Sequence, residues 1–133
     1  MSANMKKISI VTPTFNEEEN IERLCKEIKI EAETLKYDYE HIIIDNCSTD
    51  ETISKLREIS SKDKNVKVII NSRNYGHIKS PFYGVMQSTG DACILMVSDF
   101  QEPINLISQY IKKWENGAKI VLGEKNISEE NDF

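Results

Sequence analysis

The chain has 133 residues, which is enough for one domain with a sizeable core but short for an enzyme that must hold two substrates. Seventeen basic and 22 acidic residues give a formal net charge of −5 without any basic run, which argues against binding to a nucleic-acid backbone. No segment approaches the ~20 apolar residues of a membrane span, and the N-terminus lacks a signal-peptide pattern. We therefore expect a cytoplasmic domain without a membrane segment.

Strand and helix patterns alternate along the chain. Short apolar runs predict strands at 8–11, 41–44, 66–70, 92–97 and 118–122. Apolar residues at helical spacing predict helices that follow Asn16 and Ser48, span 77–89, and run from Pro103 to Asn116. This alternation predicts an α/β fold with a mostly parallel sheet and helices on both faces.

Local signals indicate where the helices begin and which side chains face the core. Asn16 is the expected N-cap of the first helix, and Ser48 with Glu51 matches a capping box for the second. The cysteines are odd in number and widely spaced, which fits a reducing compartment, and we expect Cys25 and Cys93 in the core. The apolar stripe expected on the third helix consists of Ile78, Phe82, Val85 and Met86.

Polar residues follow each of the first four predicted strands, at 12–17, 45–50, 71–77 and 98–102. In a parallel sheet these segments lie along one edge, where open α/β sheets bind ligands. Asp45 emerges there and can accept an N–H from a uracil or guanine edge, although aspartate also caps helices. Asp50 is expected to stabilise its loop.

Asp99 and Gln101 follow the fourth strand and offer hard oxygen ligands, which suit Mg²⁺ or Mn²⁺. A solvated loop with a helix cap is the alternative for this segment. A divalent cation would allow an acidic chain to hold a diphosphate. The glycine-rich fingerprints of dinucleotide-binding and P-loop proteins and the nucleophile elbow are missing from the sequence. His41 is expected to be structural, whereas the role of His77, at the same edge, stays open.

Several motifs follow one another along the chain: Val11–Glu17, Ile44–Asp50, and Ser72–His77 leading through Gly90–Asp91 to Ser98–Pro103. With these motifs in this order the chain resembles family 2 glycosyltransferases, in particular the polyprenyl-phosphate sugar transferases such as dolichol-phosphate mannosyltransferases and bactoprenol glucosyltransferases. The resemblance implies a Rossmann-like GT-A fold, truncated before the acceptor-binding half, with a nucleotide-sugar domain at 1–123 and a polar tail at 124–133. It also implies an inverting transfer by direct displacement from a UDP- or GDP-sugar, with a polyprenyl phosphate as candidate acceptor.

Family roles carry over to the matching positions of this sequence. Asp45 would hydrogen-bond the base, and Asp99 and Gln101 would bind Mg²⁺ or Mn²⁺. The residues implied to contact the nucleotide are Pro13, Thr14, Phe15, Glu17, Asp45, Asn74, Ser98 and Asp99.

Two departures from the family pattern keep other functions open. Val97 stands where the family has its first aspartate, and the chain stops before the half that holds the catalytic base and any membrane-associated segments. A non-catalytic nucleotide-binding or interaction module of the same fold is therefore the alternative, and a flavodoxin-like receiver is a weaker one. We also expect an uncovered sheet edge to favour self-association, and a longer parent protein to work at the cytoplasmic face of a membrane.

Overall fold

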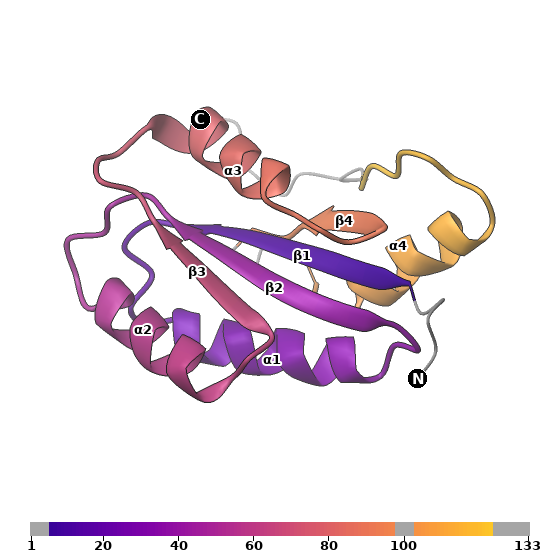
Figure 1. The fold of residues 1–133 in the computed structure, drawn as a ribbon, viewed down its shortest axis with the longest axis horizontal. Helices are drawn as coiled ribbons and strands as arrows, with labels where there is room; N and C mark the ends of the chain where they lie inside the picture. Colours follow the sequence, from indigo (N-terminus) through magenta and orange to yellow (C-terminus); the bar gives the residue numbers. More distant parts are fainter. Residues whose placement is uncertain (1–5, 98–102, 124–133) are drawn as a thin grey trace, which may run out of the picture.

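Figure 1 shows a twisted parallel sheet with helices on both of its faces, which confirms the predicted α/β architecture. The computed structural model describes residues 6–97 and 103–123. The tail at 124–133 lies outside the described residues. The elements in chain order are β1 (Lys7–Thr14), α1 (Ile21–Glu33), β2 (Asp38–Asp45), α2 (Thr52–Lys62), β3 (Val66–Ile70), α3 (Gly76–Met86), β4 (Ala92–Leu95) and α4 (Leu106–Glu115).

The described strands pair in the order β3-β2-β1-β4, and every pair is parallel. In the middle of β1, Ile10 lies opposite His41 on one side and opposite Ile94 on the other. In chain order, β2 is added on one side of β1 and β3 beyond it, and β4 then pairs with β1 on its other side. The strand order therefore reverses between β1 and β4, and open α/β sheets bind ligands at the carboxyl ends of strands that flank such a reversal.

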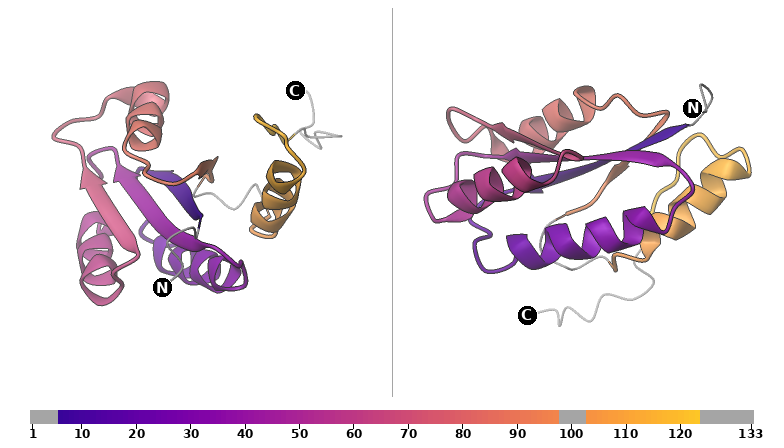
Figure 2. Two further views of the ribbon diagram at one scale, coloured as in Figure 1. Left: turned by 45° about the vertical axis from the view of Figure 1, so that its right-hand side comes forward. Right: turned by 60° about the horizontal axis from the view of Figure 1, so that its bottom comes forward.

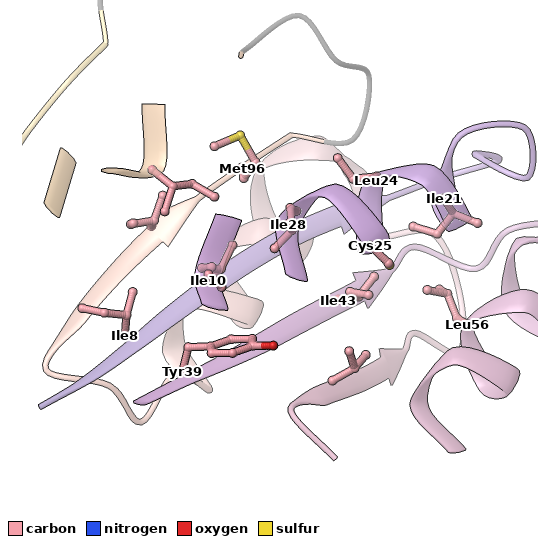
Figure 3. Close-up of a cluster of buried hydrophobic side chains, with 14 of the residues drawn as sticks. Ile8, Ile10, Ile21, Leu24, Cys25, Ile28, Tyr39, Ile43, Leu56 and Met96 are labelled. Carbon is pink, nitrogen blue, oxygen red and sulfur yellow. The ribbon is translucent and has the colours of Figure 1, made fainter. Parts of the chain in front are cut away.

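The main core lies between the sheet and helices α1, α2 and α4 (Figure 3). Apolar side chains of α1 recur at helical spacing, as predicted, and face the sheet. Burying each isoleucine or leucine contributes about 1.5–3 kcal/mol. Cys25 belongs to this core as expected, and burial, with a smaller effect of Asp63, raises the pKa of its thiol to about 12. The fully buried members from the sheet and α1 are Ile8, Ile10, Ile43, Ile21, Leu24 and Ile28.

Helix α3 covers the opposite face of the sheet (Figure 2), but not with the residues that the sequence pattern predicted. Its buried residues are Ser80 and Gly84. Of the predicted stripe, Ile78, Phe82 and Met86 are exposed to solvent and Val85 is half-buried. The physical reason is close packing. A Cβ added to Gly84 would lie 2.9 Å from side-chain atoms of both Val11 and Ile44, so only a small residue fits there.

The fourth strand and its surroundings also differ from the prediction. β4 ends at Leu95, and Cys93 is exposed rather than part of the core. Residues 118–123 form no strand, which corrects the prediction for 118–122. A cleft of about 600 Å³ separates β4 from this segment, so the two backbones cannot form the hydrogen bonds of a ladder.

Candidate functional site

A cleft of about 420 Å³ opens at the carboxyl edge of the sheet, where the strand order reverses. The end of β1 and the turn after it form one wall, β4 and Val97 form the second, and the first half of α3 forms the third. The complete lining is Pro13, Thr14, Phe15, Glu17, Asn46, Gly76, His77, Ser80, Pro81, Leu95 and Val97.

Four of the residues expected at the nucleotide lie together in this lining: Pro13, Thr14, Phe15 and Glu17. Phe15 is 45% exposed, so its ring presents a flat apolar surface that a nucleobase can stack on. His77, whose role the sequence left open, lines the same cleft. These side chains thus lie together at the shared edge of the sheet, and their contact with a nucleotide stays a prediction.

The predicted metal ligands Asp99 and Gln101, and Ser98 with them, lie outside the described residues. The described chain reaches Val97, which contributes an apolar side chain to the cleft. Within residues 6–97 and 103–123, no three His, Cys, Asp or Glu side chains are grouped closely enough to hold a metal ion. Glu17 is the carboxylate of the described lining. The described residues by themselves therefore do not form a metal centre.

Asp45, predicted to contact the base, lies behind the cleft wall and is fully buried. Its Oδ1 accepts hydrogen bonds from the hydroxyls of Thr14 at 2.9 Å and Ser48 at 2.6 Å, and its Oδ2 accepts the Ser48 N–H at 2.8 Å. The Ser48 hydroxyl also accepts the Asn16 N–H at 2.8 Å. In this structure Asp45 therefore fixes the turn after β1 from below.

The turns after β1 and β2 are bound to each other by side chains that the sequence patterns assigned to helix caps. Asn16 has a φ of +51°, and its Oδ1 accepts the Thr49 N–H at 2.9 Å. Helix α1 begins at Ile21 and α2 at Thr52, so neither Asn16 nor Ser48 caps a helix, and the predicted capping box is absent. Each side chain instead accepts a hydrogen bond from a backbone N–H of the facing turn. If the side chains capped helices, these backbone N–H groups would lose their partners.

Asp50 completes this connection and confirms the prediction that it stabilises its loop. Its Oδ1 accepts the Thr52 N–H at 2.9 Å and the Thr52 hydroxyl, and its Oδ2 accepts the Glu18 N–H at 3.3 Å. The Thr52 hydroxyl in turn accepts the Glu17 N–H at 2.9 Å. These bonds lower the pKa of Asp50 against the opposing effect of desolvation. The backbone of Glu17 is thereby held at the cleft.

Asn46 connects the end of β2 to the turn after β3, a role that the sequence interpretation missed. Its Oδ1 accepts the Tyr75 N–H at 2.8 Å, and its Nδ2 donates to Asn74 Oδ1 at 2.8 Å and to the Gly76 carbonyl at 3.2 Å. Asn74 therefore acts through this network and does not line the cleft. One feature of the sequence does point to Asn46: it is an amide residue that directly follows Asp45, at the edge where the polar segments meet.

His41 lies beneath the site and is structural, as expected. Its Nε2 is 2.8 Å from the Thr12 hydroxyl in the core, and the residue is almost fully buried. Burial lowers the pKa of His41 to about 4, an effect that Asp63 partly opposes. The imidazole is therefore neutral at physiological pH and takes no charge to the cleft.

An open parallel sheet with helices on both faces and a cleft at its strand reversal defines the class of Rossmann-like ligand-binding domains. The family model for glycosyl transferase family 2 matches residues 9–133, and the chain belongs to that family. A bactoprenol glucosyl transferase of Shigella phage SfX is 37% identical over 120 residues, covering 90% of this chain and 39% of the relative. The chain thus spans well under half of the length of the curated relatives it matches.

Solved structures of other proteins share the fold. The mannosyltransferase PcManGT from Pyrobaculum calidifontis, solved with GDP-Man and Mn²⁺, aligns with a TM-score of 0.67 at 19% identity over 83% of this chain and 32% of its own. S. aureus TarS 1–349, solved with UDP-GlcNAc, aligns with a TM-score of 0.66 at 23% identity over 83% of this chain and 31% of its own. Helices of the described part are too short or too polar to cross a bilayer.

Proposed function

We propose that this chain is the donor-binding part of an inverting glycosyltransferase that binds a UDP- or GDP-sugar with a divalent metal. The observation that carries the proposal is the gathering of Pro13, Thr14, Phe15 and Glu17 in one cleft at the strand reversal. Family membership supports the transferase class, and the two structures solved with GDP-Man and with UDP-GlcNAc support both nucleotides as candidate donors.

In this proposal the ring of Phe15 stacks on the nucleobase, while Pro13, Thr14 and Glu17 line the nucleoside pocket. A base N–H that reaches Asp45 would compete with the hydroxyls of Thr14 and Ser48, which can rotate towards other acceptors. Asn74 holds the third wall in place through Asn46. Binding thus relies on walls that hydrogen bonds fix before the ligand arrives, which lowers the entropy cost of association.

Ser98 and Asp99 would contact the diphosphate, and Asp99 with Gln101 would hold Mg²⁺ or Mn²⁺, whose charge favours departure of the diphosphate. The Mn²⁺ in the PcManGT complex supports a divalent ion in this role. A polyprenyl phosphate is the proposed acceptor, supported by the name of the bactoprenol relative, at the cytoplasmic face of a membrane. The acceptor would attack the anomeric carbon directly and invert it.

Calorimetric titration of the chain with UDP, GDP and their sugars, with and without Mn²⁺, tests the proposal. We expect metal-dependent binding of one nucleotide, and a matching rise in melting temperature because the ligand binds the folded state. Phe15→Ala should weaken binding roughly tenfold, in line with the value of a base–aromatic stack. Phe82→Ala, which removes another exposed phenylalanine outside the cleft, should leave the affinity unchanged. No binding of either nucleotide at millimolar concentration would refute the proposal.

A non-catalytic module of the same fold is the second candidate, and the observation that favours it is the apolar Val97 in the cleft wall. Asp99→Ala separates the two candidates. A working metal site loses Mn²⁺-dependent nucleotide binding in this variant, whereas a vestigial site binds nucleotide equally well with and without the substitution.

A further inference from the structure

Helix α3 presents a continuous apolar stripe to solvent. Ile78, Phe82 and Met86 are four residues apart, so they lie on one line along the helix, and they are 72%, 64% and 65% exposed. Single exposed apolar residues are ordinary, and the outward face of α1 carries one, Ile30. A contiguous stripe of large side chains instead marks a docking surface.

The chain segment that carries this stripe has charged residues of one sign. Between residues 64 and 90 the sequence contains no Asp or Glu, although the whole chain carries a net charge of −5. Lys67 of this segment forms an ion pair with Glu40. The other cations of the segment, Lys64, Arg73 and Lys79, are exposed, and Lys79 lies on α3 itself. Arg73 lies over the ring of Tyr75 at 4.6 Å. The surface therefore combines apolar side chains with positive charge.

A second cleft adjoins the stripe on the side of β3. It has a volume of about 470 Å³, and its lining contains Lys79 and the exposed rings of Tyr75 and Tyr83, but no carboxylate. A cation and two phenols beside apolar side chains suit an anionic headgroup whose acyl chains continue along the stripe. This cleft and the candidate nucleotide cleft are separate sites, because Ser80 is the one described residue that their linings share.

We propose that the outward face of α3 docks onto an anionic lipid bilayer. Ile78, Phe82 and Met86 enter the boundary between headgroups and acyl chains, as the apolar face of an interfacial helix does. Lys79 and Arg73 reach the anionic headgroups, and a phosphate headgroup occupies the cleft beside β3. The charge pattern disfavours a second copy as the occupant, because a symmetric contact would oppose the same cations without any carboxylate of this segment to pair with them.

The docking shares a membrane location with the proposed function, but it assigns the face that makes the contact and needs neither nucleotide nor metal. The side chains of His77 and Pro81 face the candidate nucleotide cleft, whereas the stripe lies on the outer side of the same helix. Membrane binding and nucleotide binding can therefore be measured and lost independently.

Flotation of the full chain with vesicles, without nucleotide, tests the proposal. We expect binding to vesicles of phosphatidylcholine mixed with phosphatidylglycerol, weaker binding to phosphatidylcholine alone, and a decrease with salt as the charges are screened. The double variant Ile78→Ser/Phe82→Ser should lower binding at least about tenfold, since it removes two large apolar groups. Ile30→Ser, at a residue 58% exposed on α1, is the matched control and should bind as the unmodified chain does.

Charge is tested by a second matched pair. Lys79→Glu should reduce binding to the anionic vesicles, whereas Lys26→Glu, an equal charge change on the exposed side of α1, should leave most of it. Circular dichroism and thermal unfolding verify that all variants are folded. Equal binding to neutral and anionic vesicles, or flotation unaffected by the Ile78→Ser/Phe82→Ser double variant, overturns the proposal. So does a chain that does not float but forms a dimer that this double variant dissociates, because the face then joins two copies.

Discussion

Cys47 offers a sharp test of the backbone conformation at the site. Its φ is +64°, in the left-handed region that residues with a Cβ rarely adopt, and it stands between Asn46 and Ser48, which connect the turns around the cleft. We compare Cys47→Gly with Cys47→Ala. Both variants remove the thiol, so the difference between them isolates the effect of a Cβ at this φ.

The magnitude follows from two opposing contributions. A Cβ in the left-handed conformation costs roughly 1–2 kcal/mol in the folded state. Glycine loses about 0.4–1 kcal/mol through the greater freedom of the unfolded chain. The net expectation is that Cys47→Gly is more stable than Cys47→Ala by about 1 kcal/mol, which is the reverse of their order in an ordinary helix.

Urea unfolding followed by circular dichroism measures the difference as a shift of the midpoint at constant slope. Lys26→Gly and Lys26→Ala, in the exposed middle of α1, form the control pair, and there alanine should be the more stable by about 1 kcal/mol. If alanine is also the more stable residue at position 47, the left-handed conformation is wrong and so is the inferred geometry of the turn.

Two further predictions concern the packing beneath the site. Gly84→Ala should destabilise the fold by about 1–3 kcal/mol, because the added methyl group meets side-chain atoms of Val11 and Ile44 at 2.9 Å; unchanged thermal unfolding would show that α3 can shift away from the sheet. The pKa of His41 is about 4 in the folded state and 6.5 in the unfolded state. Its neutral form therefore contributes to the free energy of unfolding in full above pH 6.5, and this contribution of about 3 kcal/mol is lost as the pH falls towards 4. His41→Gln should therefore flatten the loss of unfolding free energy across this pH range, and an equally steep loss in the variant would contradict the burial of a neutral imidazole.

Sequence periodicity predicted α1 well and α3 poorly, for one physical reason. The apolar residues of α1 face a single core, so the helical spacing of Ile21, Leu24 and Ile28 directly reports its buried face. In α3 the inward face is built from Ser80 and Gly84, because the helix lies too close to the sheet for larger side chains. Helical spacing of apolar residues is the same whether a helix turns its apolar stripe towards the core or, as α3 does, towards solvent.

Sequence signals for helix ends failed at the site for a related reason. Asn16, Ser48 and Glu51 have the residue types and spacing of caps, but Asn16 and Ser48 bind the facing turn instead. Their partners lie 32 and 33 residues away along the chain, so no local pattern could reveal them. The expected strand at 118–122 failed similarly, because a strand forms only where a neighbouring strand can pair with it.

The sequence by itself determined the alternation of strands and helices, the parallel sheet, the family, and the edge at which Pro13, Phe15 and Glu17 gather. These follow from apolar runs, chain order and motifs, all of which are local or sequential properties. Only the tertiary structure decided that Asp45 lies behind the cleft wall, that Asn46 connects two of its turns, and that α3 exposes its apolar stripe. Each of these depends on which distant residues occupy the space around a side chain, and that information is absent from the spacing of residues along the chain.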